Sequence, residues 1–194
     1  MTRYDTLLEL IDKYKPRSIV EIGVWNGANA IRMINRAKQY HSDITYTGYD
    51  LFEEASAETD QKEFNVKGHN SVKAVGAFIR SETGITPVLI KGDTNETLKL
   101  DVIADFVFLD GGHSVETIAH DYEAVKNSKV IVLDDYYTDG VDTSKYGCNQ
   151  LLDSFNRNHQ ILPHKDPVKG GGFCQLVVLE EEIKKLEKIM EIRP

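Results

Sequence analysis

The stretch of sequence that decides the fold is SIVEIGVWNG, residues 18–27. Its first half is rich in β-branched side chains, which predicts a short buried strand ending at Gly23. Residues 27–40 then carry apolar side chains at helical spacing, and residues 44–50 form a second β-rich run that ends at Asp50. The order of strand, glycine turn, helix and strand predicts a nucleotide-type cofactor site at the head of a Rossmann-like domain.

The same alternation continues along the chain. Helical patterns are found at 71–81, 94–98, 114–127 and 146–159, and β-rich runs at 87–90, 104–110, 129–135, 160–163 and 173–179. Strands that alternate with helices predict a parallel sheet with right-handed crossovers. The last two runs are separated only by a turn-rich stretch, which predicts a closing antiparallel hairpin. The predicted fold class is therefore α/β, a Rossmann-like, mostly parallel seven-stranded sheet with helices on both faces.

The length of 194 residues suits one domain with a full core, and we expect a single domain over residues 1–194. Residues 1–16 predict a leader helix. Residues 52–70 are polar and irregular, and predict either a mobile lid or a poorly ordered insert. Apolar residues at helical spacing over 180–192 predict a terminal amphipathic helix.

Composition narrows the function classes. The formal net charge of −8 disfavours nucleic acid as a partner, because affinity for phosphate backbones comes largely from basic side chains. No apolar run approaches the roughly 20 residues of a membrane span, and the N-terminus lacks the apolar core of a signal peptide. We expect a cytoplasmic protein without a membrane partner, and the oligomeric state stays open. Cys148 and Cys174 are expected to be reduced thiols.

Residues that follow the strands are the expected ligand contacts, because ligands in such folds bind at the carboxyl ends of the strands. Gly23 permits a tight turn, and Gly27 lets the next helix begin close to a ligand. Trp25 stands where the G-x-G-x-x-G pattern has its second glycine, which disfavours a pyrophosphate at the turn. Asp50 is placed to accept hydrogen bonds from ribose hydroxyls.

With these features the chain resembles the class I S-adenosylmethionine-dependent methyltransferases. Residues 20–27 are similar to the first motif of that class, Asp50 to its ribose-binding acid, and Gly92-Asp93 to the position that contacts adenine. The resemblance covers about residues 17–180 and implies S-adenosylmethionine as the cofactor. The residues that it implies for the cofactor site are Glu21, Gly23, Asn26, Gly27, Asp50, Asp93 and Asp110.

Three aspartates form the second group of candidate residues. Asp110 ends one buried strand, and Asp134 and Asp135 end the next. Neighbouring parallel strands would bring them to one edge, where three carboxylates repel one another unless a cation lies among them. Oxygen ligands suit Mg²⁺, Mn²⁺ or Ca²⁺. The alternative is that Asp110 caps the following helix and that the other two lie in a solvated turn.

His113 follows Asp110 by three residues in a glycine-rich loop, where a histidine beside a metal could act as a general base. The Asp-x-x-His and Asp-Asp-Tyr segments resemble the metal-dependent, macrocin-type sugar O-methyltransferases of methyltransferase family 24. That resemblance implies metal ligands at Asp110, Asp134 and Asp135 and a base at His113. Those enzymes are usually longer, so the resemblance implies their metal-assisted chemistry for this chain more readily than it implies their acceptor.

The function expected from the sequence is metal-assisted O-methylation of a hydroxyl on a small molecule or sugar, with S-adenosylmethionine and a divalent cation, Mg²⁺ by preference, as cofactors. The partner would be a small-molecule or glycan acceptor. Two alternatives stay open at this point. One is an NAD(P)-dependent oxidoreductase on the same architecture, and the other is a non-catalytic, methyltransferase-like binding module.

Overall fold

The structure, a computed structural model, describes residues 2–65, 67–154 and 158–180, whose strands form one sheet in the order β3-β2-β1-β4-β5-β7-β6. The strands are β1 (Ser18–Ile22), β2 (Thr45–Asp50), β3 (Val88–Lys91), β4 (Phe106–Leu109), β5 (Val130–Thr138), β6 (His159–Pro167) and β7 (Phe173–Glu180). The first five are parallel, and β7 runs antiparallel between β5 and β6. The predicted Rossmann-like sheet and its closing hairpin are confirmed.

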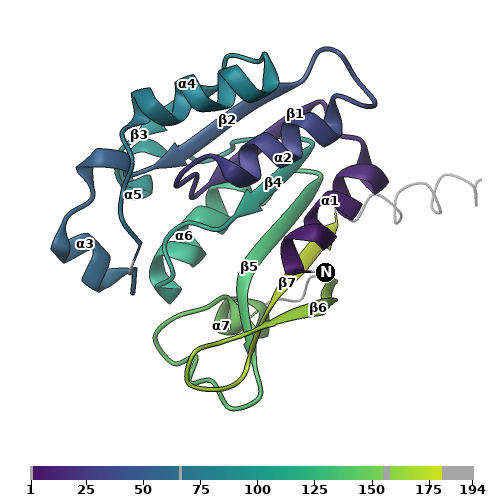
Figure 1. The fold of residues 1–194 in the computed structure, drawn as a ribbon. Coiled ribbons are helices and arrows are strands. Elements are labelled where there is room, and N and C mark those ends of the chain that lie inside the picture. The colour runs from purple at the N-terminus through teal and green to yellow at the C-terminus, as the bar shows by residue number, and fades with distance from the viewer. Residues whose placement is uncertain (1, 66, 155–157, 181–194) are drawn as a thin grey trace, which may run out of the picture.

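Helices cover both faces of the sheet (Figure 1). They are α1 (Arg3–Tyr14), α2 (Ala28–Ala37), α3 (Ala57–Lys62), α4 (Val72–Thr83), α5 (Thr94–Thr97), α6 (Val115–Val125) and α7 (Asn149–Asp153), with a 3-10 turn, η1 (Phe52–Glu54). Ile11, Met33 and Ile79 anchor α1, α2 and α4 in one core, and Val125 and Leu152 anchor α6 and α7 in the other. Each such side chain, once buried, stabilises the fold by about 1.5–3 kcal/mol.

Three elements near the C-terminus differ from the predicted boundaries, and one of them is β6, which was expected over 160–163 and spans His159–Pro167. Within the described part of 146–159, the expected helix is α7 and begins only at Asn149, because Gly147 adopts a left-handed conformation and its N–H donates to the carbonyl of His113. Strand β5 was expected to end at Asp135 but continues to Thr138, because β7 pairs with it beyond the two aspartates. The paired strands β5 and β7 therefore extend beyond Asp134 and Asp135.

The segment 52–70 contains more regular structure than its composition predicts. It holds η1 and α3, and the Ser56 side chain caps α3 by accepting from the Thr59 N–H. In Figure 1, α3 lies beyond the carboxyl ends of the parallel strands. The terminal helix expected over 180–192 lies outside the described residues, apart from Glu180 at the end of β7.

Both cysteines are free and buried, as expected of structural thiols. Among the residues that the structure describes, no helix has the length and apolar character needed to cross a bilayer.

Candidate active site

A cavity of about 580 Å³ lies at the carboxyl ends of the parallel strands. Its wall combines the turn after β1, the ends of β2 and β4, the starts of α2 and α5, and the segment 52–70. From the set predicted by sequence, the residues on this wall are Gly23, Asn26, Asp50, Asp93, Asp110 and His113. The strand order reverses between β1 and β4, which is where open α/β sheets bind their ligands.

Gly23 allows the loops after β1 and β4 to touch. It has φ +90°, and a Cβ added to it would lie 1.9 Å from the carbonyl oxygen of Asp110. The Asp110 N–H in turn donates to the carbonyl of Ile22 (2.8 Å). Since no side chain fits in that space, glycine at this position brings the turn after β1 against Asp110.

Asp50 is fixed at the end of β2 by two backbone donors. Its Oδ2 accepts from the Trp25 N–H and its Oδ1 from the Phe52 N–H, both at 2.7 Å. Each carboxylate oxygen has more than one lone pair, so Asp50 retains the capacity to accept from a ligand hydroxyl. Asp93 likewise caps α5 by accepting from the Asn95 N–H.

Two predicted cofactor residues lie behind the wall. The Glu21 side chain is buried within the sheet and accepts a hydrogen bond from the Tyr46 hydroxyl. Burial raises the pKa of Glu21 to about 8, which keeps its carboxyl group largely protonated at neutral pH. Gly27 packs against Ile79 and Val75 of α4. Neither Glu21 nor Gly27 belongs to the described residues that line the cavity.

The segment 52–70 covers the cavity and is held down at two points. Glu63 accepts from the Ser114 N–H (2.9 Å) and from the Thr117 hydroxyl (2.7 Å) at the start of α6. On the other side, the Trp25 indole N–H donates to the carbonyl of Gly68 (2.9 Å). Sequence analysis missed Glu63, because an acidic residue in a polar stretch carries no periodic signal.

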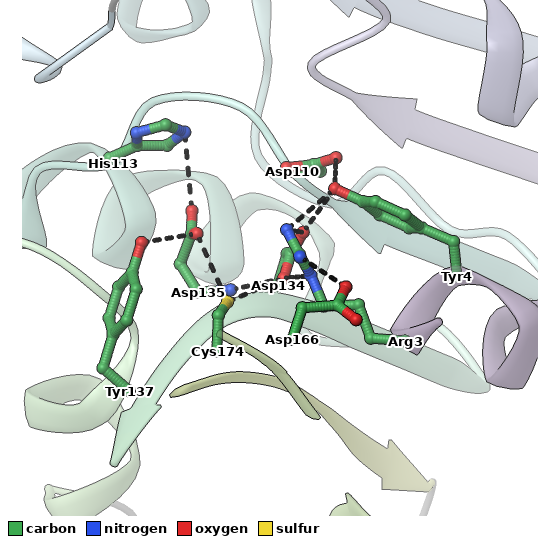
Figure 2. A network of polar contacts seen from close by, with 9 residues as sticks. All are labelled: Arg3, Tyr4, Asp110, His113, Asp134, Asp135, Tyr137, Asp166 and Cys174. Atoms are coloured by element: carbon green, nitrogen blue, oxygen red, sulfur yellow. Dashed lines mark hydrogen bonds and ion pairs between the residues drawn. The ribbon is translucent and has the colours of Figure 1, made fainter. Parts of the chain in front are cut away.

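The structure brings the three aspartates together beside His113. Asp134 and Asp135 lie at a bulge in β5, and Asp135 has φ +61°. The bulge lets two consecutive side chains point toward the same edge. Oδ2 of Asp135 lies 3.5 Å from Nε2 of His113, and Oδ1 of Asp135 accepts from the Tyr137 hydroxyl (2.8 Å) (Figure 2).

Two residues of α1 that sequence analysis did not single out also reach this cluster. Arg3 forms an ion pair with Asp134 (Nε to Oδ1, 2.8 Å) and another with Asp166 of β6 (2.9 Å). The Tyr4 hydroxyl donates to Asp134 (3.0 Å) and lies 3.4 Å from Asp110. Burial opposes ionisation of Asp134, but the Arg3 guanidinium outweighs it and holds the pKa of Asp134 below its usual range.

The donor set fits a divalent cation. One atom each from Asp110, His113 and Asp135 lie within 4.8 Å of one another, and so do atoms of Asp134, Asp135 and Cys174. Burial, followed by repulsion from neighbouring carboxylates, raises the pKa values of Asp110 and Asp135 above their usual range. Carboxylate oxygens suit Mg²⁺ and Mn²⁺ better than a thiol does, which favours the group in which Asp110 and Asp135 lie beside His113 over the group that contains Cys174.

Comparison of the sequence with models of known protein families shows which family the chain belongs to. The family model described as a methyltransferase domain matches residues 20–136. The chain belongs to this methyltransferase family. The matched residues run from β1 through the two aspartates of β5, so they include both the cofactor turn and the acid cluster. The class I S-adenosylmethionine-dependent type predicted from the sequence is confirmed.

Solved structures share the fold of this methyltransferase at low sequence identity. The O-methyltransferase NovP has a TM-score of 0.63 at 17% identity, with 92% of this chain and 79% of NovP covered. TomG from Streptomyces achromogenes, solved with S-adenosylmethionine, has a TM-score of 0.59 at 15% identity, with 92% of this chain and 79% of TomG covered. An O-methyltransferase from Bacillus cereus, solved with S-adenosylhomocysteine, has a TM-score of 0.58 at 14% identity, with 92% of this chain and 80% of that enzyme covered. None of the curated proteins matches the sequence significantly.

Proposed function

We propose that this methyltransferase transfers the methyl group of S-adenosylmethionine to a hydroxyl of a small-molecule or sugar acceptor. The observation that carries the proposal is the continuous cavity wall, which joins Asp50 and Asp93 at one end to Asp110 and His113 at the other. The cavity volume falls in the range of about 300–1,000 Å³ that is usual for small-molecule sites. The neighbours named as O-methyltransferases support an oxygen acceptor.

The cofactor half of the cavity would bind S-adenosylmethionine through groups already fixed in place. Asp50 would accept from the ribose hydroxyls, Asp93 would contact the adenine, and the turn at Gly23 and Asn26 would surround the methionine part. Because the backbone holds the Asp50 carboxylate at both oxygens, little further ordering is needed when the cofactor binds.

The acceptor half would align an oxygen with the sulfonium methyl, which is already activated for transfer. The methyl group passes from sulfur to the acceptor oxygen, and the sulfonium becomes a neutral thioether. The hydroxyl proton goes to Nε2 of His113, whose 3.5 Å separation from Asp135 would stabilise the resulting imidazolium. A divalent cation held by carboxylates of the cluster that Asp110, Asp134 and Asp135 form would supply Lewis acidity that lowers the pKa of the hydroxyl.

The test combines binding and turnover. We expect calorimetry to detect S-adenosylmethionine but not NADH, whereas tight binding of NADH alone would favour the oxidoreductase alternative. His113→Ala should lower kcat about 100-fold with a panel of sugar and phenol acceptors and leave cofactor affinity unchanged. His41→Ala, which removes a half-buried histidine that contacts the Lys15 carbonyl outside the cavity, is the matched control. Unchanged turnover in His113→Ala would exclude His113 as the base.

Removal of metal tests the cation. Dialysis against EDTA should abolish most methyl transfer, and Mg²⁺ or Mn²⁺ should restore it, while S-adenosylmethionine still binds the stripped protein. Full activity after chelation would show that methyl transfer needs no cation and that Asp110, Asp134 and Asp135 have a structural role. Absence of methyl transfer with any acceptor, despite cofactor binding, would favour the binding-module alternative.

A further inference from the structure

Arg3, the first residue of α1, projects into the acid cluster and holds Asp134 in a two-point ion pair (Figure 2). Its Nε donates to Oδ1 of Asp134 (2.8 Å) and its Nη2 to Oδ2 (3.0 Å). Its Nη1 donates to Asp166 of β6 (2.9 Å). The side chain of Asp134 is completely buried, and that of Arg3 is only 17% exposed. A planar guanidinium that meets a carboxylate at two points is a strong and directional contact.

The other contacts of Asp134 use its remaining capacity. Oδ1 also accepts from the Asp135 N–H (2.8 Å) and from the Cys174 thiol (3.5 Å), and Oδ2 also accepts from the Tyr4 hydroxyl (3.0 Å). Oδ1 thus has three donors and Oδ2 has two, and a carboxylate oxygen has about two lone pairs with which to accept. A cation could coordinate Asp134 only by displacing Arg3 or Tyr4 and leaving a buried donor without its partner.

Asp110 and Asp135 have more capacity left. Among the residues that the structure describes, the Asp110 side chain has one long hydrogen-bond contact, with the Tyr4 hydroxyl (3.4 Å). Asp135 accepts from Tyr137 through Oδ1, while its Oδ2 faces Nε2 of His113. One oxygen of Asp110 and one of Asp135 lie within 4.8 Å of each other, close enough to share one ion.

The formal charges also assign Asp134 to Arg3 and leave Asp110 and Asp135 for a cation. Three ionised carboxylates carry −3, and Arg3 offsets one of them. Asp166 shares the guanidinium but is 27% exposed, so water also screens it. The remaining −2 on Asp110 and Asp135 matches a single divalent cation.

We propose that Arg3 is the permanent counter-ion of Asp134, so that a divalent cation at this edge is held through Asp110 and Asp135 and not through Asp134. Arg3 is then a positioning residue, because it fixes Asp134 beneath the site without touching the ion. This inference deepens the metal-assisted form of the proposed function and narrows its ligand set.

The test is Mn²⁺ binding to the full chain, measured by electron paramagnetic resonance of free Mn²⁺. The decisive variant is Arg3→Gln with Asp134→Asn, which removes the ion pair as a unit and leaves the net charge unchanged. We expect its Mn²⁺ affinity to stay within about threefold of the wild-type value, because the pair does not bind the ion. Asp110→Asn and Asp135→Asn, which each remove one carboxylate ligand, should weaken binding at least about tenfold.

Loss of Mn²⁺ binding in the double variant, to the same extent as in Asp110→Asn, would overturn the proposal and make Asp134 a ligand. Failure of the wild type to bind Mn²⁺ would overturn it as well, and S-adenosylmethionine binding by the same sample would show that the methyltransferase assignment survives. If the double variant does not fold, wild-type crystals soaked in Mn²⁺ decide the question. An anomalous peak between Asp110 and Asp135, with Arg3 still on Asp134, supports the proposal, and a peak on Asp134 with Arg3 displaced refutes it.

Discussion

Glu21→Gln should change how the stability of the protein depends on pH. Glu21 is a carboxyl group in the middle of the sheet, 1% exposed, with the Tyr46 hydroxyl as its partner. Burial raises its pKa to about 8, against an ordinary value of 4.5. Between these two pH values the folded protein binds a proton that the unfolded chain has released. The free energy of unfolding therefore falls as the pH rises through this window.

The size of the effect follows from the separation of the two pKa values. Each unit of separation corresponds to about 1.36 kcal/mol, so the complete change amounts to about 5 kcal/mol. Most of it lies between pH 5 and pH 8, where the wild type should lose about 3–4 kcal/mol through Glu21 alone. Glutamine has nearly the same shape and does not titrate, so the variant should not show this loss.

Urea denaturation followed by circular dichroism at pH 5, 6, 7 and 8 measures the difference. Any fixed cost of fitting an amide beside Tyr46 shifts the Glu21→Gln curve by a constant amount. The stability gap between the two proteins should therefore move by about 3–4 kcal/mol in favour of the variant from pH 5 to pH 8. A gap that is the same at both ends would refute the assignment of a protonated, buried Glu21.

Three further variants test the cavity wall. Gly23→Ala should lower the free energy of unfolding by about 3 kcal/mol or more in urea denaturation, because its Cβ would overlap the carbonyl oxygen of Asp110; wild-type stability would contradict this. Glu63→Gln weakens the two hydrogen bonds that hold the segment 52–70 to α6 and should reduce S-adenosylmethionine affinity about tenfold in calorimetry. Glu58→Gln, at an exposed position of α3, is its control. If Glu63→Gln and Glu58→Gln bind S-adenosylmethionine equally well, the Glu63 contact does not hold the segment 52–70 over the cavity. Asp50→Ala, without its carboxylate, should lose most cofactor affinity, and retained affinity would remove it from the ribose contact.

The cofactor half of the site could be predicted from the sequence because its signals are local. Gly23 and Asp50 each follow a strand directly, and a parallel sheet aligns the carboxyl ends of its strands. Glu21 shows where this reasoning stops. Its place in the first motif suggests a ligand contact, but alternation along β1 turns its side chain into the core, where Tyr46 on β2 receives it.

The acceptor half depends on contacts between segments that are distant in sequence. That Asp110, Asp134 and Asp135 end neighbouring strands is visible in the sequence, and so is the glycine-rich loop of His113. The positive charge among them is not visible, because Arg3 lies 131 residues from Asp134. A single arginine at the start of an amphipathic helix has the same pattern as an ordinary solvent-exposed residue.

The contacts of Arg3 explain why the leader helix and the closing hairpin belong to the site. Arg3 spans from Asp134 on β5 to Asp166 on β6, and α1 packs against β6 through the Thr6 hydroxyl and His164 (2.8 Å). The cofactor turn contributes nothing to this contact. A rearrangement of the hairpin would therefore shift Asp134 and, through the bulge, Asp135.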